Sequence, residues 1–111
     1  MKDNNVYLKH ILEAIQNIDD YINGLNFNLF SGDKKTVDAV VRELEIIGEA
    51  ANNLSDKFKN SYPEIPFRDM IDMRNVLIHE YFGVNKKVVW DTCKENLPKL
   101  KEIVEETLKS S

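Results

Sequence analysis

The sequence has few of the residues that build disulfides, metal sites and membrane spans. Cys93 is its only cysteine, so no disulfide can form within the chain. One cysteine and two histidines, His10 and His79, cannot fill the usual ligand sets of a zinc site, and the carboxylates show no metal-binding spacing. No apolar run approaches the roughly 18 residues that span a bilayer. We therefore expect no metal, no cofactor and no membrane segment.

The sequence also lacks a surplus of basic residues. The chain has 15 Lys and Arg against 19 Asp and Glu, a net charge of −4, which argues against a general nucleic-acid binder because such proteins carry a basic surplus.

The first residues lack the apolar stretch of a secretory signal, so we expect a cytoplasmic protein. A length of 111 residues, 42% of them hydrophobic, predicts one globular domain spanning 1–111.

The first half of the chain shows two apolar stripes with the three- and four-residue spacing of a helical face. The first ends at Gly24, a natural helix stop. The second follows a predicted loop at 25–32, with Ser31 or Asp33 as its cap. The stripes consist of Val6 or Leu8, Ile11, Leu12, Ile15, Ile18 and Ile22, then Val37, Val40, Val41, Leu44, Ile47, Ala51 and Leu54. Gly48 interrupts the second stripe at a cost of about 1 kcal/mol relative to alanine, which predicts close approach of a neighbouring helix.

The second half begins with a short helical turn at 55–62. Pro66 then suits the first turn of a long helix over 67–82. Gly83 ends this helix, and Asn85 can cap the next one.

The last helical stretch continues the apolar pattern to Leu108 and includes Cys93, which we expect in the core. Pro98 falls inside this stretch and should kink it or split it in two. No segment shows the alternation of a strand. The sequence therefore predicts an all-α bundle of four to five helices.

The helix predicted at 67–82 carries an unusual set of polar residues. Arg74 lies beside its apolar face, and Tyr81, seven residues on, lies almost beneath Arg74. Asn75 and His79 are i, i+4 neighbours on another side. At about 100° per residue, Arg74 and His79 are about 140° apart. Two packed helices would bring such residues together more readily than one helix does. The spacing therefore favours a site at a helix–helix or subunit interface. Because the Arg74 side chain is long, a site within one monomer is also compatible with it.

These residue types suit the cleavage of RNA. RNA supplies its own nucleophile, the 2′-hydroxyl, so a metal-bound water is not obligatory. Histidine changes its protonation near neutral pH and can serve as acid or base, here His79. Arginine stays charged and binds phosphate oxygens with a planar fork, here Arg74. Asn75 could orient the imidazole or the substrate.

Each of these residues also has a structural interpretation. Arg74 could pair with Asp72 or with a glutamate on another helix. His79 could be a surface or interface histidine, and an Arg five residues before a His is a weak pattern by itself. Glu49 lies beside Gly48. A polar contact between helices and a functional role are equally good interpretations of this residue.

A longer set of motifs resembles a known family. The run 74–81 resembles the R-x4-H-x-Y motif of HepT-like toxins of the HEPN superfamily. Three other stretches match that family in the same order, namely 48–51 (Gly-Glu-Ala-Ala), 63–67 (Pro-Glu-Ile-Pro-Phe), and Val-Trp at 89–90 with Asn-Leu-Pro at 96–98. The resemblance covers nearly the whole chain. It departs mildly at Phe67, where many relatives carry Trp.

The resemblance implies a function with named residues. It implies a HEPN-like helical homodimer whose two motifs face a shared cleft and cleave RNA without a metal ion. Arg74 and His79 would be catalytic, and Asn75 a supporting residue. The partner would be a nucleotidyltransferase antitoxin of the MNT type, which silences the toxin by transferring AMP from ATP onto Tyr81.

Two alternatives from other functional classes stay open. The chain could be a non-catalytic helical module that docks a nucleotidyltransferase, which the acidic net charge favours slightly. It could also be the substrate-docking subunit of such an enzyme, which predicts nucleotide binding without RNA cleavage. The set of Arg74, Asn75, His79 and Tyr81 favours the nuclease, because a scaffold does not need all four.

Overall fold

The structure is a computed structural model that describes residues 4–63, 65, 67–79 and 85–110, with residues 76–79 described by their backbone alone. Within these ranges every regular element is a helix, so the all-α prediction is confirmed. The elements are α1 (Asn4–Ile22), α2 (Phe27–Ser31), α3 (Lys34–Asn53), α4 (Asp56–Ser61), α5 (Phe67–His79), α6 (Lys86–Asp91), the π-helical segment η2 (Thr92–Asn96) and α7 (Leu97–Ser110). None of the described helices is long and apolar enough to cross a membrane.

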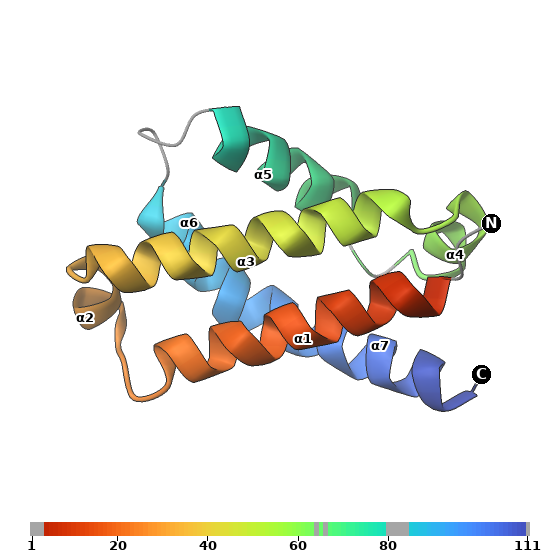
Figure 1. Cartoon of the computed structure of the whole chain (residues 1–111), viewed down its shortest axis with the longest axis horizontal. Coiled ribbons are helices and arrows are strands. Elements are labelled where there is room, and N and C mark those ends of the chain that lie inside the picture. Colours follow the sequence, from red (N-terminus) through yellow and green to blue (C-terminus); the bar gives the residue numbers. More distant parts are fainter. Residues whose placement is uncertain (1–3, 64, 66, 80–84, 111) are drawn as a thin grey trace.

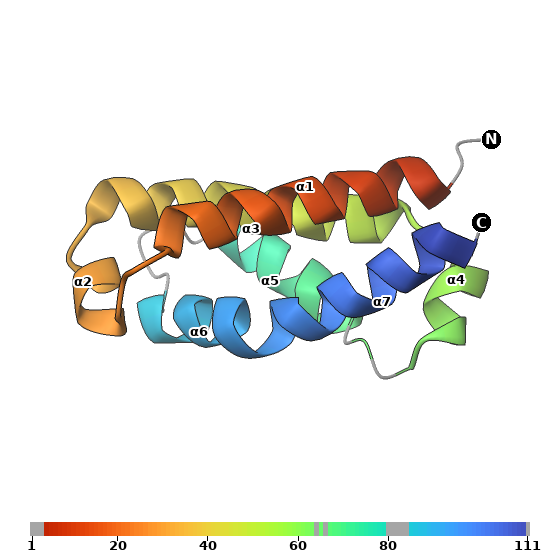
Figure 2. The same cartoon turned by 90° about the horizontal axis from the view of Figure 1, so that it is seen from below.

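Helix α3 is the central element of the bundle. It lies between α1 and α5 and packs against both (Figure 1). In the perpendicular view, α1 and α3 form one layer, and α5, α6 and α7 lie beneath it (Figure 2). The two short helices α2 and α6 contact each other at the end of the bundle where α3 begins.

The core is formed by the apolar stripes that the sequence predicts. The stripe of α1 includes Leu8, which is fully buried, whereas Val6 is 44% exposed, so the buried stripe of α1 begins at Leu8. The stripe of α3 is buried throughout. Cys93 is 3% exposed and lies in the same cluster, as predicted.

The prediction of a loop at 25–32 is wrong, because this segment contains α2. The Asn26 side chain accepts a hydrogen bond from the backbone N–H of Leu29 and so caps the helix. Phe30 is fully buried and packs against Trp90, with 5.1 Å between the ring centroids. A five-residue helix is too short to show a periodic stripe, and its stability depends on a contact with a distant residue.

Most of the predicted helix ends are confirmed. Gly24 follows α1 with φ of +80°, a left-handed conformation that glycine adopts without steric cost. Asp33 caps α3, Asn85 caps α6, and α4 lies where the short turn at 55–62 is predicted. The predicted end of the long helix at 82 and its stop at Gly83 lie outside the described residues.

Pro98 interrupts the last helical stretch as predicted, through a change of hydrogen-bond register. The segment just before it is η2, in which the Leu97 N–H donates to the Thr92 carbonyl, five residues earlier. Proline has no N–H to continue the regular i→i−4 ladder, so the break lies where the ladder would have lost a bond.

Candidate active site

Helices α3 and α5 approach each other closely at Gly48. A Cβ atom built on Gly48 would lie 2.3 Å from Cβ and 2.9 Å from Cγ of Arg74, and 3.1 Å from the carbonyl oxygen of Met70. Non-bonded carbon atoms prefer separations of about 3.5–4 Å, so no side chain fits here without displacing α5. The predicted reason for Gly48 is confirmed, and the neighbour is the helix that carries Arg74.

The guanidinium of Arg74 is held at both terminal nitrogens. Nη2 donates a hydrogen bond to Oε2 of Glu49 on α3 and forms an ion pair with it. Nη1 donates to the side-chain oxygen of Asn75. The Arg74 side chain is 20% exposed and that of Glu49 is 58% exposed, so the guanidinium is largely covered while the carboxylate reaches water.

The donors of Arg74 are only partly used by these contacts. A guanidinium has five N–H groups. One on each terminal nitrogen is taken by Glu49 and Asn75, and Nε is buried with no hydrogen-bond partner among the residues whose side chains the structure describes. The described side chains make no other hydrogen bond to these two nitrogens, so with respect to them each nitrogen keeps one further N–H that could donate a hydrogen bond to an oxyanion.

Of the two structural partners considered for Arg74, the glutamate on another helix is the one observed. Asp72 instead lies 3.4 Å from Nε of Arg68, one turn earlier on the exposed face of α5. Glu49 thus joins the site from α3. The motif spacing within α5 could not indicate this. The signals in the sequence are the position of Glu49 next to Gly48 and its place in the 48–51 stretch that resembles the family.

The other predicted site residues are only partly covered by the structure. Arg74 and Asn75 are adjacent and in contact. His79 is the last residue of α5, on the same helix as Arg74, and its side chain is not among those described. Tyr81 lies outside the described residues. The helix through His79 keeps Arg74 and His79 on one continuous element, as the motif predicts.

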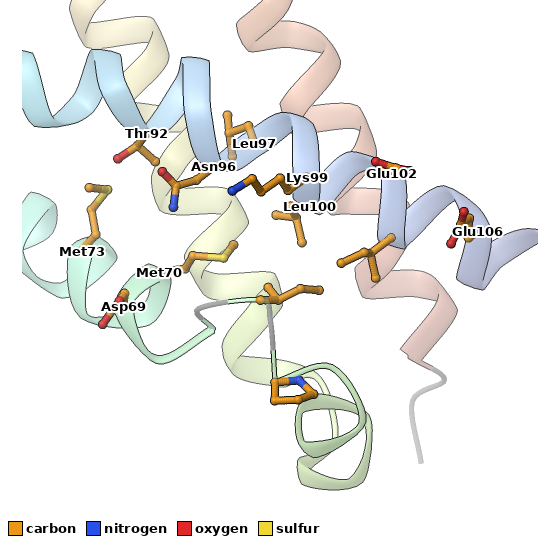
Figure 3. Close-up of a pocket in the computed structure, with 13 residues that line it drawn as sticks. Asp69, Met70, Met73, Thr92, Asn96, Leu97, Lys99, Leu100, Glu102 and Glu106 are labelled. Atoms are coloured by element: carbon orange, nitrogen blue, oxygen red, sulfur yellow. The ribbon is translucent and has the colours of Figure 1, made fainter.

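Two hollows border this region. Glu49 lines a hollow of about 310 Å³ between α1 and α3, together with Tyr7, His10 and Arg42. His10 is exposed there. A second hollow of about 560 Å³ opens between α5 and the segment η2–α7, and Figure 3 shows Met70 and Met73 of α5 on its wall. The facing side chains include Leu97, Leu100 and Ile103, so this second hollow is mainly apolar.

The described residues offer few groups for alternative chemistry. No cluster of three or more His, Cys, Asp or Glu among them could hold a metal ion. Burial, with a smaller contribution from Asp19, raises the pKa of the Cys93 thiol to about 12. A thiol with such a pKa stays protonated at neutral pH, which makes Cys93 a core residue and a poor nucleophile.

Comparisons with known proteins agree with the motifs. The family described as Ribonuclease HepT-like matches residues 11–107. A protein of Thermococcus cleftensis named a probable ribonuclease HepT is 52% identical over 95 residues, 86% of each chain. Two other relatives have names that give RNase as their expected activity. The one from Methanocaldococcus jannaschii is 43% identical to this chain, over 97% of this chain and 89% of the relative. The one from Caldanaerobacter subterraneus subsp. tengcongensis is 40% identical, over 97% of this chain and 96% of the relative.

No solved structure gives a significant match. The family match nevertheless extends from α1 to α7 and includes both the Gly48–Glu49 pair on α3 and the Arg74–His79 spacing on α5. The chain belongs to the ribonuclease HepT-like family.

Proposed function

We propose that this chain is an endoribonuclease, a single HepT-like domain over 1–111 that cuts RNA without a metal ion. Arg74 and His79 are its catalytic residues, and Asn75 supports them. The observation that carries the proposal is the anchored guanidinium of Arg74, held by Glu49 and Asn75 five residues before His79 on one helix. The names of the relatives support RNA as the substrate.

The reaction follows from the chemistry of RNA and of these two side chains. The neutral imidazole of His79 takes the proton of a ribose 2′-hydroxyl, and the 2′-oxygen attacks the adjacent phosphorus. The bond from phosphorus to the 5′-oxygen breaks, the 5′-oxygen takes up a proton, and a 2′,3′-cyclic phosphate remains. Arg74 stabilises the negative charge that builds on the phosphate oxygens, through the N–H groups that Glu49 and Asn75 leave available.

Expression in bacteria tests the catalytic residues directly. Wild-type protein is expected to stop growth and fragment total RNA, and Arg74→Ala and His79→Ala are expected to abolish both effects. Arg68→Ala and His10→Ala are matched controls, since each removes an exposed residue of the same type that takes no part in the Arg74–Glu49 ion pair, and both should stay toxic. Healthy growth of all five strains with soluble protein would contradict the proposal.

Metal independence has its own test. Purified wild-type protein is expected to cut a fluorescently labelled single-stranded RNA at the same rate in EDTA and in Mg²⁺, because the nucleophile is the 2′-hydroxyl and the charge is supplied by Arg74. The same RNA with 2′-deoxyribose at every position should stay intact. Cleavage of the deoxy substrate, or loss of RNA cleavage in EDTA, would contradict this mechanism.

We place the working site at the interface of a homodimer. A helix puts Arg74 and His79 about 140° apart, so one helix does not direct both side chains at the same point. In a dimer, one copy would supply Arg74 and the other copy His79. The apolar hollow between α5 and α7 supports a partner surface on the same helix. Met73→Glu in this hollow should yield an inactive monomer in light scattering, and Val88→Glu, an exposed apolar residue on α6, should leave an active dimer.

The family resemblance supports a toxin–antitoxin role in the cytoplasm. In this proposal an MNT-type nucleotidyltransferase transfers AMP from ATP to Tyr81, seven residues after Arg74. The attached phosphate would bring negative charge to the cation that otherwise binds RNA. Protein produced with such a partner should gain the mass of AMP and lose RNA cleavage, and Tyr81→Phe should prevent both changes. An unmodified Tyr81 in protein that has been silenced would contradict this step.

A non-catalytic docking subunit for a nucleotidyltransferase is the second candidate. The net charge of −4 favours it, because an acidic surface repels RNA. It predicts that Arg74→Ala and His79→Ala leave the cellular effect unchanged, so the expression experiment separates the two functions.

A further inference from the structure

We propose that Glu49 is the positioning residue that aims Arg74 at the substrate phosphate. The proposal rests on the proposed function, because it assigns a role within the same site. Glu49 stands outside the R-x4-H-x-Y motif at 74–81, since it lies on α3 and precedes Arg74 by 25 residues. Its partner is the guanidinium that has to meet the developing charge in the reaction.

Three contacts fix the Arg74 side chain in space. Its Cβ and Cγ lie against the Gly48 backbone, at distances that leave no room for a side chain at Gly48. Nη2 is held by Glu49, and Nη1 is held by Asn75. A planar group that is held at its stem and at two of its corners has one orientation, so the direction of its remaining N–H groups is fixed.

Fixed orientation matters more for the reaction than for folding. An arginine with no partner samples many rotamers, and most of them take the charge away from a given phosphate. Donors that are already in place stabilise a transition state without reorganisation. By contrast, an ion pair whose carboxylate is 58% exposed contributes little to the stability of the fold. The expected effect of Glu49 is therefore on the rate of the chemical step.

Glu49 and the phosphate use different N–H groups of Arg74. The carboxylate contacts Nη2 alone, through Oε2, and the Asn75 oxygen contacts Nη1. Each terminal nitrogen carries two N–H groups, so one on each remains for a hydrogen bond to a phosphate oxygen. Glu49 can thus stay bound while Arg74 engages the substrate, which distinguishes positioning from competition.

Another carboxylate on α3 provides a matched control. Glu45 lies one turn before Glu49 and pairs with Arg42 at 3.4 Å, on the same helix and without contact to Arg74. Removing either carboxylate changes the net charge equally. A difference between the two variants then reports on the contact with Arg74.

The experiment is single-turnover cleavage of a fluorescently labelled mixed-sequence RNA. Glu49→Ala is expected to lower the maximal rate on the order of 10–100-fold, with the half-saturating concentration within about 3-fold of wild type because binding is largely kept. Glu49→Gln keeps an acceptor oxygen and should restore most of the rate, and Glu45→Ala should match wild type. Thermal unfolding of each variant confirms that it is folded.

A second readout follows the guanidinium itself. In ¹⁵N-labelled wild-type protein, the Arg74 Nε–H signal should report a rigid side chain in relaxation measurements. It should become mobile in Glu49→Ala and stay rigid in Glu49→Gln and Glu45→Ala. This measurement does not depend on RNA cleavage.

The outcomes separate the positioning role from the nuclease. Equal maximal rates for Glu49→Ala and wild type, or a rigid Arg74 in both, would overturn the positioning role and leave the nuclease standing. A faster Glu49→Ala with tighter RNA binding would show competition instead, and would also overturn it. Wild-type protein that leaves the RNA intact would overturn the nuclease, and with it the catalytic consequence of Glu49.

Discussion

Helix α3 has two packed sides that are built from different chemistry. Toward α1 the contact is made by long apolar side chains, and Ile11, Ile15 and Ile18 are each at most 1% exposed. Toward α5 the contact includes Gly48, which has no side chain, and Glu49, whose carboxylate holds Arg74. Buried apolar area provides stability and tolerates moderate changes of shape. A backbone contact that positions one guanidinium tolerates almost none, so the two sides should respond differently to substitution.

The largest loss of stability is expected on the α1 side. Ile15→Ala removes a fully packed side chain and leaves a cavity, which should lower the free energy of unfolding by about 2–5 kcal/mol. Below the unfolding temperature, RNA cleavage per folded molecule should stay close to wild type because Arg74 is untouched. Denaturant titration measures the first quantity and the cleavage assay the second.

The Cys93 thiol adds a check on the same variant. Buried and with a raised pKa, it should react slowly with iodoacetamide in the wild type and faster in Ile15→Ala, as the population of opened molecules grows. A stable Ile15→Ala protein with greatly reduced RNA cleavage would contradict the expected difference between the α1 side and the α5 side of α3.

A smaller loss of stability with a larger loss of function is expected on the α5 side. Gly48→Ala places a methyl group 2.3 Å from Cβ of Arg74, so α5 must move, at a cost of about 1–3 kcal/mol. Cleavage should fall well beyond what the folded fraction explains, because Arg74 moves with α5.

Gly32→Ala is the control for this substitution. A Cβ there would meet only the Asn28 carbonyl oxygen at 3.4 Å, which is close to ordinary contact. Its stability and cleavage should both stay near wild type. Unchanged cleavage in a folded Gly48→Ala protein would show that the geometry of the α3–α5 contact does not control the site.

The smallest effect is expected at the start of α3, which belongs to neither side. Hydrogen bonds from the Thr36 hydroxyl and backbone N–H lower the pKa of Asp33. Since the folded-state pKa is the lower one, the cap adds stability above the unfolded pKa and loses it as the pH falls through the folded pKa. Asp33→Ala should therefore destabilise at neutral pH and be nearly silent in strong acid, with cleavage unchanged. An equal destabilisation at both pH values would argue against an ionised cap.

The apolar part of this architecture could be predicted because burial follows the helical period. The stripes of α1 and α3 and the cap at Asp33 were accessible from spacing and residue type alone. The partner of Arg74 was not, because Asp72 on the same helix and a glutamate on another are equally good by charge, and the choice depends on where α5 crosses α3. Helix α2 was missed for a related reason, since Phe30 is held by Trp90, far away in the sequence.

The close approach at Gly48 also has an evolutionary consequence. The nearest contact is with Cβ of Arg74, an atom that every residue except glycine carries, so a side chain at 48 is compatible with the fold only if position 74 is also glycine or α5 moves. Glycine at 48 is therefore required by the crossing of the two helices, whatever residue stands at 74. We expect glycine at 48 to persist among related sequences that keep this crossing, including members that have lost the arginine.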